Sequence, residues 1–487
     1  MSCRKKTAST WIASGAARLG LAAKDREENT SENAAPQPAP RTTQARLQAT
    51  LRRGDEALSP RLLRRLLADL QVAASAQVSD VEGGQRAQAL MDWYATANAR
   101  ERLDLWRLVV EHFSADAERI RQAHESYDAA ADAHEARAAE MELARALVSP
   151  RRRLLQRFAV PANGVRFLVD LRAELLPLLR EESWLKPLDA ELERLFSTWF
   201  DLAFLEMRRL TWDSPASLLE KMIRYEAVHD IRDWADLKNR LDCDRRCYGF
   251  FHPRLPDEPL IFVEIALLQE VAASVAPLLD EHAETAEAER ANTAIFYSIS
   301  NTQTGLRGVS FGNSLIKHVV QTLQAELPRL RTFATLSPMP GFHRWLNRQG
   351  EASLETLPEK LRAELAEALP QGDAPLFARL LDAARDAPEQ EEKTPVREAL
   401  LRLAAHYLGK SEADGRVRDP VARFHLGNGA RVERINWAGD LSARGRAQSF
   451  GMMVNYLYDL KRLDQHRSQL AKGRVPASRE VRAWLSD

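Results

Sequence analysis

The spacing of hydrophobic residues divides the chain into two parts. Over residues 44–188, Ala, Leu, Arg and Glu are frequent and β-branched residues are rare, while apolar positions such as Leu105, Val109 and Phe113 recur three or four residues apart. Such a stripe is typical of helices that bury one face against each other. We therefore predict an all-α helical bundle over 44–188, with breaks at Ser59-Pro60, Gly83-Gly84 and Ser149-Pro150.

The pattern changes over residues 189–487, where short runs of aromatic and β-branched residues lie between turns and helical stretches. Runs of this kind predict strands, at 248–251, 260–265 and 293–299. Residues 350–400 are helical in pattern, with an exposed loop expected at 388–393. The second part is therefore predicted to be a mixed α/β domain, and the fold class is α+β overall.

Charge and cysteine content exclude several classes of protein. The chain has 487 residues with 69 basic and 69 acidic side chains, so no overall field favours nucleic acid or an anionic membrane surface. No run approaches the roughly 18 apolar residues of a membrane span. Cys3, Cys243 and Cys247 make no disulfide framework, which fits a reducing compartment. Cys243, Cys247 and His252 lack a fourth ligand, so we predict no metal site.

The N-terminal segment allows two interpretations. Its first 24 residues hold five basic side chains, no acidic one, and several Ser, Thr and Ala, which is the composition of an organelle transit peptide. The polar, proline-bearing stretch that follows instead favours a disordered tail over 1–43. A tail predicts a cytoplasmic protein, and a transit peptide predicts a mitochondrial one.

A glycine-bearing loop, 307–313, lies between the strand expected at 293–299 and a helix whose apolar face begins at Leu315. A loop of this kind before a helix points amide donors and the positive end of the helix dipole at one spot, which suits a pyrophosphate. Its R-G-x-x-x-G spacing resembles the loop by which GNAT acyltransferases grip coenzyme A, with Ser310 where the middle glycine usually stands. An ordinary loop that holds two glycines is the alternative.

Ser337 ends a short strand-like run and precedes a turn stiffened by Pro338, Pro340 and Gly341. Proline keeps the preceding residue out of helical geometry, so we expect an exposed hydroxyl in a fixed position. The chain has no G-x-S-x-G elbow here, which disfavours a hydrolase nucleophile. Two roles for the Ser337 hydroxyl remain open: it could cap the element that follows, or it could contact a ligand.

His425 lies in a strand-like run, 423–426, before the turn signal 427–429 and a returning strand over 430–435. With an ordinary pKa near about 6.5, a histidine can donate a proton to carbon at neutral pH. Lone histidines more often have a structural role. Polar residues that could orient the ring follow at Asn436, Asp440, Asn455 and Tyr456.

Five ordered motifs carry a resemblance to a known family. They are 246–253 (RCYGFFHP), 296–303 (FYSISNTQ), 336–342 (LSPMPGF), 424–430 (FHLGNGA) and 451–456 (GMMVNY). Over roughly residues 45–460 the chain resembles malonyl-CoA decarboxylases. The resemblance implies an N-terminal helical bundle that contributes to oligomer formation and a GNAT-like catalytic domain over 189–487. The implied reaction converts malonyl-CoA into acetyl-CoA and carbon dioxide.

The resemblance also implies roles for particular residues. The catalytic serine falls on Ser337 and the proton-donating histidine on His425, both also in contact with substrate. The malonyl-CoA loop falls on Arg307, Gly308, Val309, Ser310, Phe311, Gly312 and Asn313. No metal or prosthetic group is expected, and the expected assembly is a homo-oligomer, with a tetramer as a candidate size.

Arg307 departs from the family's loop pattern, and Glu264 is a further candidate for the site. The family loop often starts with Gln, whereas this chain has Arg307, which adds a positive charge near the expected phosphates. Glu264 lies in an apolar run and is expected to be half-buried at a strand end rather than catalytic. Two other functions remain as alternatives: a GNAT-type acyltransferase, which would need an acceptor channel and a base, and an inactive CoA-sensing or assembly protein.

Overall fold

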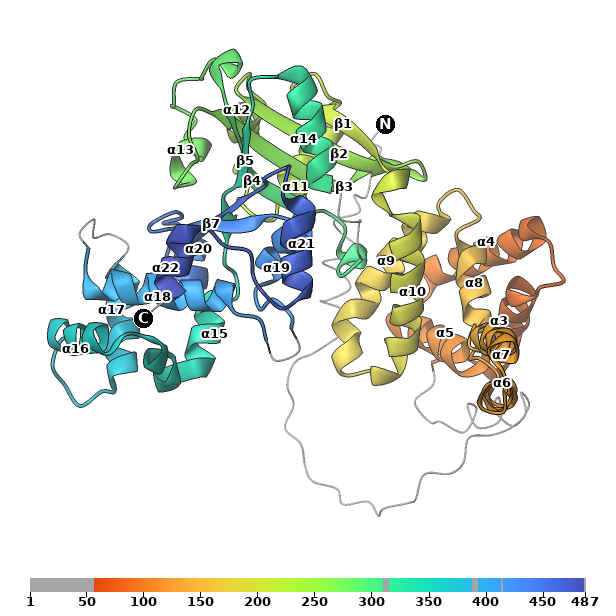
Figure 1. Ribbon diagram of the computed structural model, residues 1–487. Helices are drawn as coiled ribbons and strands as arrows, with labels where there is room; N and C mark the ends of the chain where they lie inside the picture. The colour runs from red at the N-terminus through yellow and green to blue at the C-terminus, as the bar shows by residue number, and fades with distance from the viewer. Residues whose placement is uncertain (1–56, 310–314, 388–392, 413–414, 486–487) are drawn as a thin grey trace. The chain divides into compact units, whose positions relative to one another are not determined.

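The computed structural model describes residues 57–309, 315–387, 393–412 and 415–485 (Figure 1). Two compact units make up the chain. The helical unit comprises the residues up to Phe196 together with 304–308, and the mixed unit comprises 197–303 and the residues from Val309 onward. The predicted tail over 1–43 and most of the loop expected at 388–393 lie outside the described residues.

The helical unit is all-α in its described part, as the hydrophobic stripe predicted. Its helices are α3 (Pro60–Ala74), α4 (Asp80–Thr96), α5 (Ala99–His112), α6 (Ala117–Asp128), α7 (Ala133–Ala146), α8 (Pro150–Phe158), α9 (Gly164–Leu175) and α10 (Lys186–Trp199). Short 3-10 turns, Leu176–Arg180 and Ser183–Leu185, connect α9 to α10.

Helix breaks were predicted correctly at two of three positions. Ser59 caps α3 by accepting from the Leu62 N–H, with proline at the first turn, and α8 likewise starts at Pro150. The break at Gly83-Gly84 is wrong, because both glycines lie inside α4. A Cβ at Gly84 would lie 2.7 Å from Val160 Cγ1. These glycines therefore serve close packing rather than a turn.

The mixed unit contains one eight-stranded sheet and helices around it. The strands are β1 (Glu206–Leu210), β2 (Arg245–His252), β3 (Leu255–Leu268), β4 (Thr293–Asn301), β5 (Thr332–Thr335), β6 (Ser337–Pro338), β7 (Arg431–Asn436) and β8 (Met453–Leu457). The helices are α11 (Ala216–Tyr225), α12 (Trp234–Arg240), α13 (Ala276–Leu279), α14 (Leu315–Glu326), α15 (Phe342–Gln349), α16 (Glu359–Ala368), α17 (Leu376–Asp386), α18 (Pro395–Gly409), α19 (Pro420–Gly427), α20 (Ala443–Ser449), α21 (Leu463–Ala471) and α22 (Arg479–Leu485).

The strand order is β1-β2-β3-β4-β5-β8-β6, and β7 pairs with β8. Only β4 and β5 pair in parallel, while the other neighbours are antiparallel. A parallel pair needs a crossover, which α14 supplies across the strands (Figure 1). The strands predicted at 248–251, 260–265 and 293–299, the helix expected from Leu315 and the mixed α/β architecture are therefore confirmed.

Hydrophobic clusters hold the helices to this sheet. One cluster joins α11 and α12 to β1, β2 and β3 through Leu210, Leu219, Met222, Ile231, Leu237, Cys247, Phe251 and Phe262. A second surrounds β4 and β5 and includes Ala266, Val275, Leu278, Ile295, Tyr297, Ala334, Leu336 and Met453. Strand β5, which leads to Ser337, is therefore anchored from several sides.

The expectation for Glu264 is wrong. Its side chain is fully buried in the middle of β3 and lies 3.2 Å from the Arg240 guanidinium, which also pairs with the buried Asp236. Burial, together with the nearby charge of Glu226, raises the pKa of Glu264 to about 8. The apolar run that contains Glu264 is a central strand, so both of its faces are covered.

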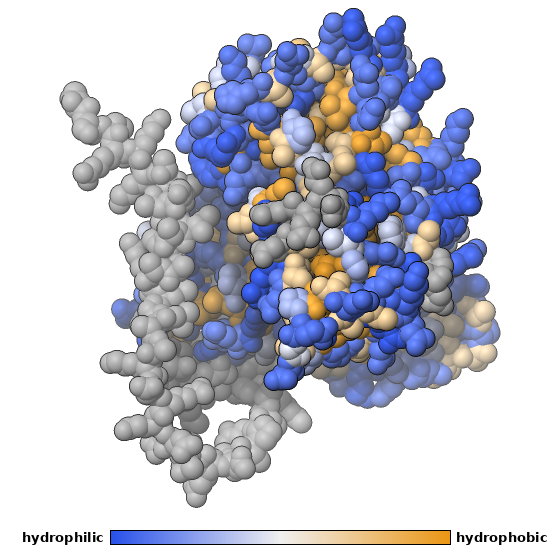
Figure 2. Space-filling model, turned by 90° about the vertical axis from the view of Figure 1, so that its left-hand side faces the viewer, coloured by the Kyte–Doolittle hydropathy of each residue, from blue (hydrophilic) through white to orange (hydrophobic). Residues whose placement is uncertain are grey.

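None of the helices in the described ranges is long and apolar enough to span a bilayer. Figure 2 shows that the face seen from the side of α13, α16 and α17 is mainly hydrophilic, with smaller hydrophobic patches. This surface agrees with the 28% content of charged residues.

Candidate active site

Ser337 begins β6, which one residue separates from the end of β5, and pairs with Val454 of β8. Its side chain is 5% exposed, so the expected exposed hydroxyl is wrong. Pairing on β8 and the cover of neighbouring elements bury it, which the local proline pattern does not reveal. The cap alternative is not supported either, because the N-cap residue of α15 is Gly341 and no side chain caps this helix.

His425 lies on helix α19, and the predicted strand at 423–426 is therefore wrong. Asp419 caps this helix and Pro420 occupies its first turn, a helix start that outweighs the apolar character of the run. The turn expected after it is present, with Gly429 at a positive φ of 89° before β7. Position in the last turn of a short helix directs the ring into the unit's interior, where it is 3% exposed.

The structure brings Ser337 and His425 together. The Ser337 hydroxyl lies 3.2 Å from His425 Nε2 and donates to Thr335 Oγ1 at 2.9 Å. Since that donation uses the only serine proton, the Ser337 oxygen must accept from the Nε2–H group, so Nε2 carries the ring proton. Nδ1 of the neutral ring then accepts from the Tyr458 hydroxyl at 2.8 Å. The proton of His425 therefore points at Ser337.

The His425 ring is enclosed by aromatic side chains. It stacks on Tyr456 with 4.7 Å between ring centroids and meets the edges of Phe424 and Tyr458. This burial lowers the pKa of His425 to about 3. The ring is consequently neutral at neutral pH, whereas an ordinary pKa would leave it partly charged.

Of the residues expected to orient His425, Tyr456 contacts it by stacking. Asn455 instead donates to the Thr335 carbonyl at 2.7 Å and accepts from Asn436, so it supports the strand that leads to Ser337. Tyr458 was not predicted. It lies two positions after Tyr456 and one residue beyond β8, and the two-residue spacing of side chains on one face of a strand is the signal that could have found it.

The predicted substrate loop is described only in part. Arg307 and Gly308 belong to the helical unit and Val309 to the mixed unit, whereas Ser310, Phe311, Gly312 and Asn313 lie outside the described residues.

The buried Arg172 of α9 holds the start of this loop. Its guanidinium donates to the carbonyl oxygens of Gly305 and Arg307 at 2.9 and 2.8 Å and pairs with Asp189. Gly308 has a φ of 83°, which glycine adopts without strain.

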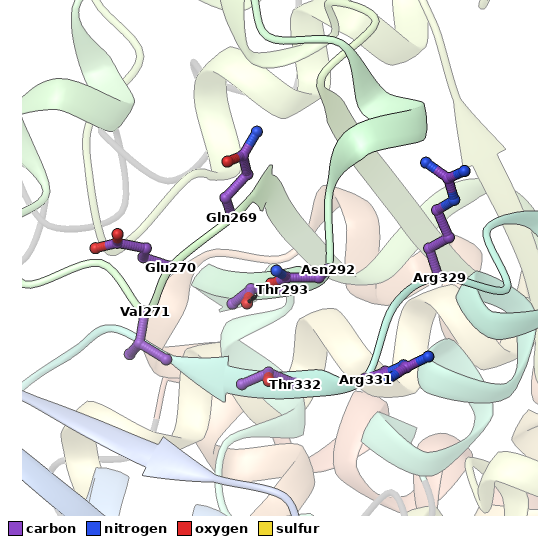
Figure 3. Close-up of a pocket in the computed structure, with 8 residues that line it drawn as sticks. All are labelled: Gln269, Glu270, Val271, Asn292, Thr293, Arg329, Arg331 and Thr332. Carbon is purple, nitrogen blue, oxygen red and sulfur yellow. Dashed lines mark hydrogen bonds between the residues drawn. The ribbon is translucent and has the colours of Figure 1, made fainter.

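A cavity of about 640 Å³ lies elsewhere in the mixed unit, at the amino ends of β4 and β5 (Figure 3). Thr293 and Thr332, the first residues of the two parallel strands, line it. The side chains of Arg329 and Arg331 point in different directions in Figure 3. Neither Ser337 nor His425 lines this cavity, so it is not the candidate site.

The cysteine motif forms no metal centre in the described part of the chain. Cys247 is buried in β2 and Cys243 is exposed. Across the described ranges, no group of three His, Cys, Asp or Glu side chains could hold a metal ion.

Comparison with known protein families shows to which family the chain belongs. The C-terminal domain of malonyl-CoA decarboxylase matches residues 203–487, and its N-terminal domain matches residues 113–200. The chain belongs to the malonyl-CoA decarboxylase family. Membership confirms the predicted enzyme class, a malonyl-CoA decarboxylase and hence a carboxy-lyase.

Individual members of the malonyl-CoA decarboxylase family resemble the chain over most of its length. The mitochondrial malonyl-CoA decarboxylase of Anser anser anser is 39% identical over 355 residues, 70% of each chain. The malonyl-CoA decarboxylase structure from Cupriavidus metallidurans is 44% identical with a TM-score of 0.72, and covers 87% of this chain and 100% of its own. The one from Agrobacterium vitis is 38% identical with a TM-score of 0.73, over the same shares.

Proposed function

We propose that the chain converts malonyl-CoA into acetyl-CoA and carbon dioxide at the Ser337–His425 pair. The observation that carries this proposal is the buried 3.2 Å contact between the Ser337 hydroxyl and His425 Nε2 in a member of this family. When substrate binds, the Ser337 hydroxyl turns its proton from Thr335 Oγ1 to the malonyl carboxylate, and His425 protonates carbon.

The reaction needs a carboxylate held out of the thioester plane. When the bond between the α-carbon and the carboxyl carbon breaks, its electron pair moves into the thioester and forms an enolate, while carbon dioxide leaves. A hydroxyl fixed on a strand can hold the carboxylate in that orientation, which is a positioning effect. Ser337 suits this role because its partner Thr335 and the pairing of β6 with β8 fix its position.

His425 supplies the proton that completes acetyl-CoA. In the free protein the ring is neutral, because burial lowers its pKa to about 3. A bound malonyl carboxylate brings a negative charge beside the ring, which favours the charged imidazolium and raises its pKa. The ring therefore takes up a proton from water together with the substrate and gives it to the α-carbon after carbon dioxide has left, which balances the overall consumption of one proton.

The 307–313 loop binds the coenzyme A phosphates in this proposal. Support comes from its place between β4 and α14, from the positive φ of Gly308, and from the ties of Arg172 to the backbone that leads into it. The charge of Arg307 adds attraction for phosphate oxygens.

We also propose a homo-oligomer formed with the help of the helical unit, in line with the family resemblance. A cytoplasmic location is our proposal for the compartment. A mitochondrial location is the alternative, because the goose relative is named as mitochondrial.

The direct test supplies the purified protein with malonyl-CoA and no acyl acceptor. We expect carbon dioxide and acetyl-CoA in equal amounts. Malonyl-CoA that stays intact until an amine or carrier protein is added would instead identify an acyltransferase, and intact malonyl-CoA under all conditions would identify a protein that only binds it.

A further inference from the structure

Asp419 connects the two elements that carry Ser337 and His425. It is the N-cap of α19, where its Oδ1 accepts from the backbone N–H groups of Val421 and Ala422 at 2.8 and 3.0 Å. Its carboxylate also accepts from the backbone N–H of Gly341, in the turn four residues after Ser337. One side chain thus binds the helix of His425 and the turn of Ser337.

Tyr407 of α18 completes the arrangement. Its hydroxyl donates to Asp419 Oδ2 at 2.9 Å. A Cβ added at Gly341 would lie only 2.3 Å from this hydroxyl, so glycine allows the turn to approach it. Phe342 and Trp345 of α15 pack against the Tyr407 ring. The turn, α18 and α19 therefore meet at Asp419.

The chemistry of this position requires a carboxylate. Asp419 is 0% exposed, and its two oxygens accept four hydrogen bonds without donating any. An asparagine could keep its oxygen on the helix N–H groups, and the Tyr407 hydroxyl could rotate to accept from the new amide. The Gly341 N–H could not adapt in this way, because a backbone N–H only donates and the new amide group would face it with a second donor. An Asp419→Asn variant therefore keeps the helix cap and releases the turn.

We infer that Asp419 is a positioning residue for the proposed decarboxylation: it fixes the turn after Ser337 to the helix of His425 and so sets the contact between their side chains. The inference rests on the proposed roles of Ser337 and His425. Asp419 acts through them and does not touch the substrate.

Steady-state kinetics with malonyl-CoA test this role. Asp419→Asn should lower kcat roughly tenfold and leave KM within about twofold, since loss of orientation affects the transition state more than binding. In a Ser337→Ala background the same change should cost less than about twofold, because residues that act as a unit are not additive. Tyr407→Phe should lower kcat less, by about threefold. This loss should likewise become smaller in the Ser337→Ala background.

Asp233→Asn is the matched control. Asp233, an exposed residue, caps α12 by accepting from the Ala235 and Asp236 N–H groups at 2.8 and 3.0 Å, which is the same capping pattern. Its kcat should equal that of the unmodified protein. Melting temperatures show whether each variant folds. If Asp419→Asn does not fold, Tyr407→Phe decides by the same criteria.

Three results would overturn the inference: an equal loss of kcat with and without Ser337, a raised KM at unchanged kcat, or an equal loss in Asp233→Asn. Failure of the proposed function looks different. In that case Ser337→Ala and His425→Asn alone would keep full turnover, whatever Asp419→Asn does.

Discussion

At the residue scale, the chemistry depends on how the His425 ring is held. Tyr458 bonds Nδ1, Ser337 lies at Nε2, and Tyr456 covers the ring face. These contacts select one tautomer and one orientation, and the exclusion of water strengthens every polar interaction within the site. The same burial suppresses the charged form until an anion binds beside it.

Removing the Tyr458 hydroxyl should slow the reaction. Tyr458→Phe keeps the ring but leaves Nδ1 without its donor, so the tautomer with a proton on Nε2 and the orientation of the ring are supported from the Ser337 side alone. We expect turnover to fall roughly tenfold, less than the about 100- to 10,000-fold cost of losing a general acid. Tyr127→Phe, on the exposed surface of α6, is the control in the same assay. Unchanged turnover of Tyr458→Phe would contradict the role of the hydroxyl.

The low pKa of His425 predicts a dependence of stability on pH. Between about pH 6.5 and pH 3 the unfolded chain binds a proton at this residue that the folded protein does not. The free energy of unfolding must therefore rise with pH across this window. Denaturant titrations at pH 5 and 6 should show a change smaller by about 1 kcal/mol in His425→Asn than in the unmodified protein. Equal changes would mean that the ring is charged in the fold.

Sequence reasoning found Ser337 and His425 but not their surroundings. Motif order and residue type sufficed to select both. The helix under the histidine has a local start signal, Asp419 followed by Pro420, which the strand prediction overlooked. Burial of the serine and the contact of the Tyr458 hydroxyl depend on segments far apart in the sequence, such as β5 and β8, whose Thr335 and Asn455 are 120 residues apart. A local pattern carries no record of such contacts.

At the element scale, the crossover from β4 through α14 to β5 places the proposed phosphate loop and Ser337 after two parallel strands. Runs of aromatic and β-branched residues indicated the strands because both strands are buried, and helical spacing indicated α14 because it has one apolar face. The two glycines in α4 led to the wrong prediction of a helix break, because glycine in a sequence does not distinguish a turn from close helix packing.

The ties of Arg172 predict an effect on substrate binding. Arg172→Met removes the donors to the Gly305 and Arg307 carbonyl oxygens, and we expect KM for malonyl-CoA to rise roughly tenfold, as loss of charged hydrogen bonds allows. Arg166→Met on the same helix, which breaks a surface pair with Asp170, should leave KM unchanged. Equal KM values in both variants would show that Arg172 does not contribute to malonyl-CoA binding by the 307–313 loop.

At the scale of the whole molecule, each unit has its own core, and the helical unit exposes apolar side chains on the α6–α7 hairpin. No residue of α6 is buried, and only Ala146 is buried in α7. Tyr127, Met141 and Leu147 are all more than two-fifths exposed. This surface suits contact with a second copy of the chain, as the proposed oligomer requires.

A charge on that hairpin should weaken assembly. We expect light scattering to give a mass that is a multiple of 54.9 kDa for the unmodified protein and a lower mass for Met141→Arg. Leu460→Arg, the same change at an exposed leucine of the mixed unit, is the control. A mass of 54.9 kDa for the unmodified protein would contradict the oligomer, and an unchanged mass of Met141→Arg would place the contact elsewhere.

The central claim is that Ser337 and His425 carry out the decarboxylation. Carbon dioxide release from malonyl-CoA by Ser337→Ala and His425→Asn tests it most directly, with binding of malonyl-CoA measured in parallel. Our account predicts that each variant loses at least roughly tenfold in turnover while the substrate still binds. Full turnover in both variants would show that the reaction takes place without them.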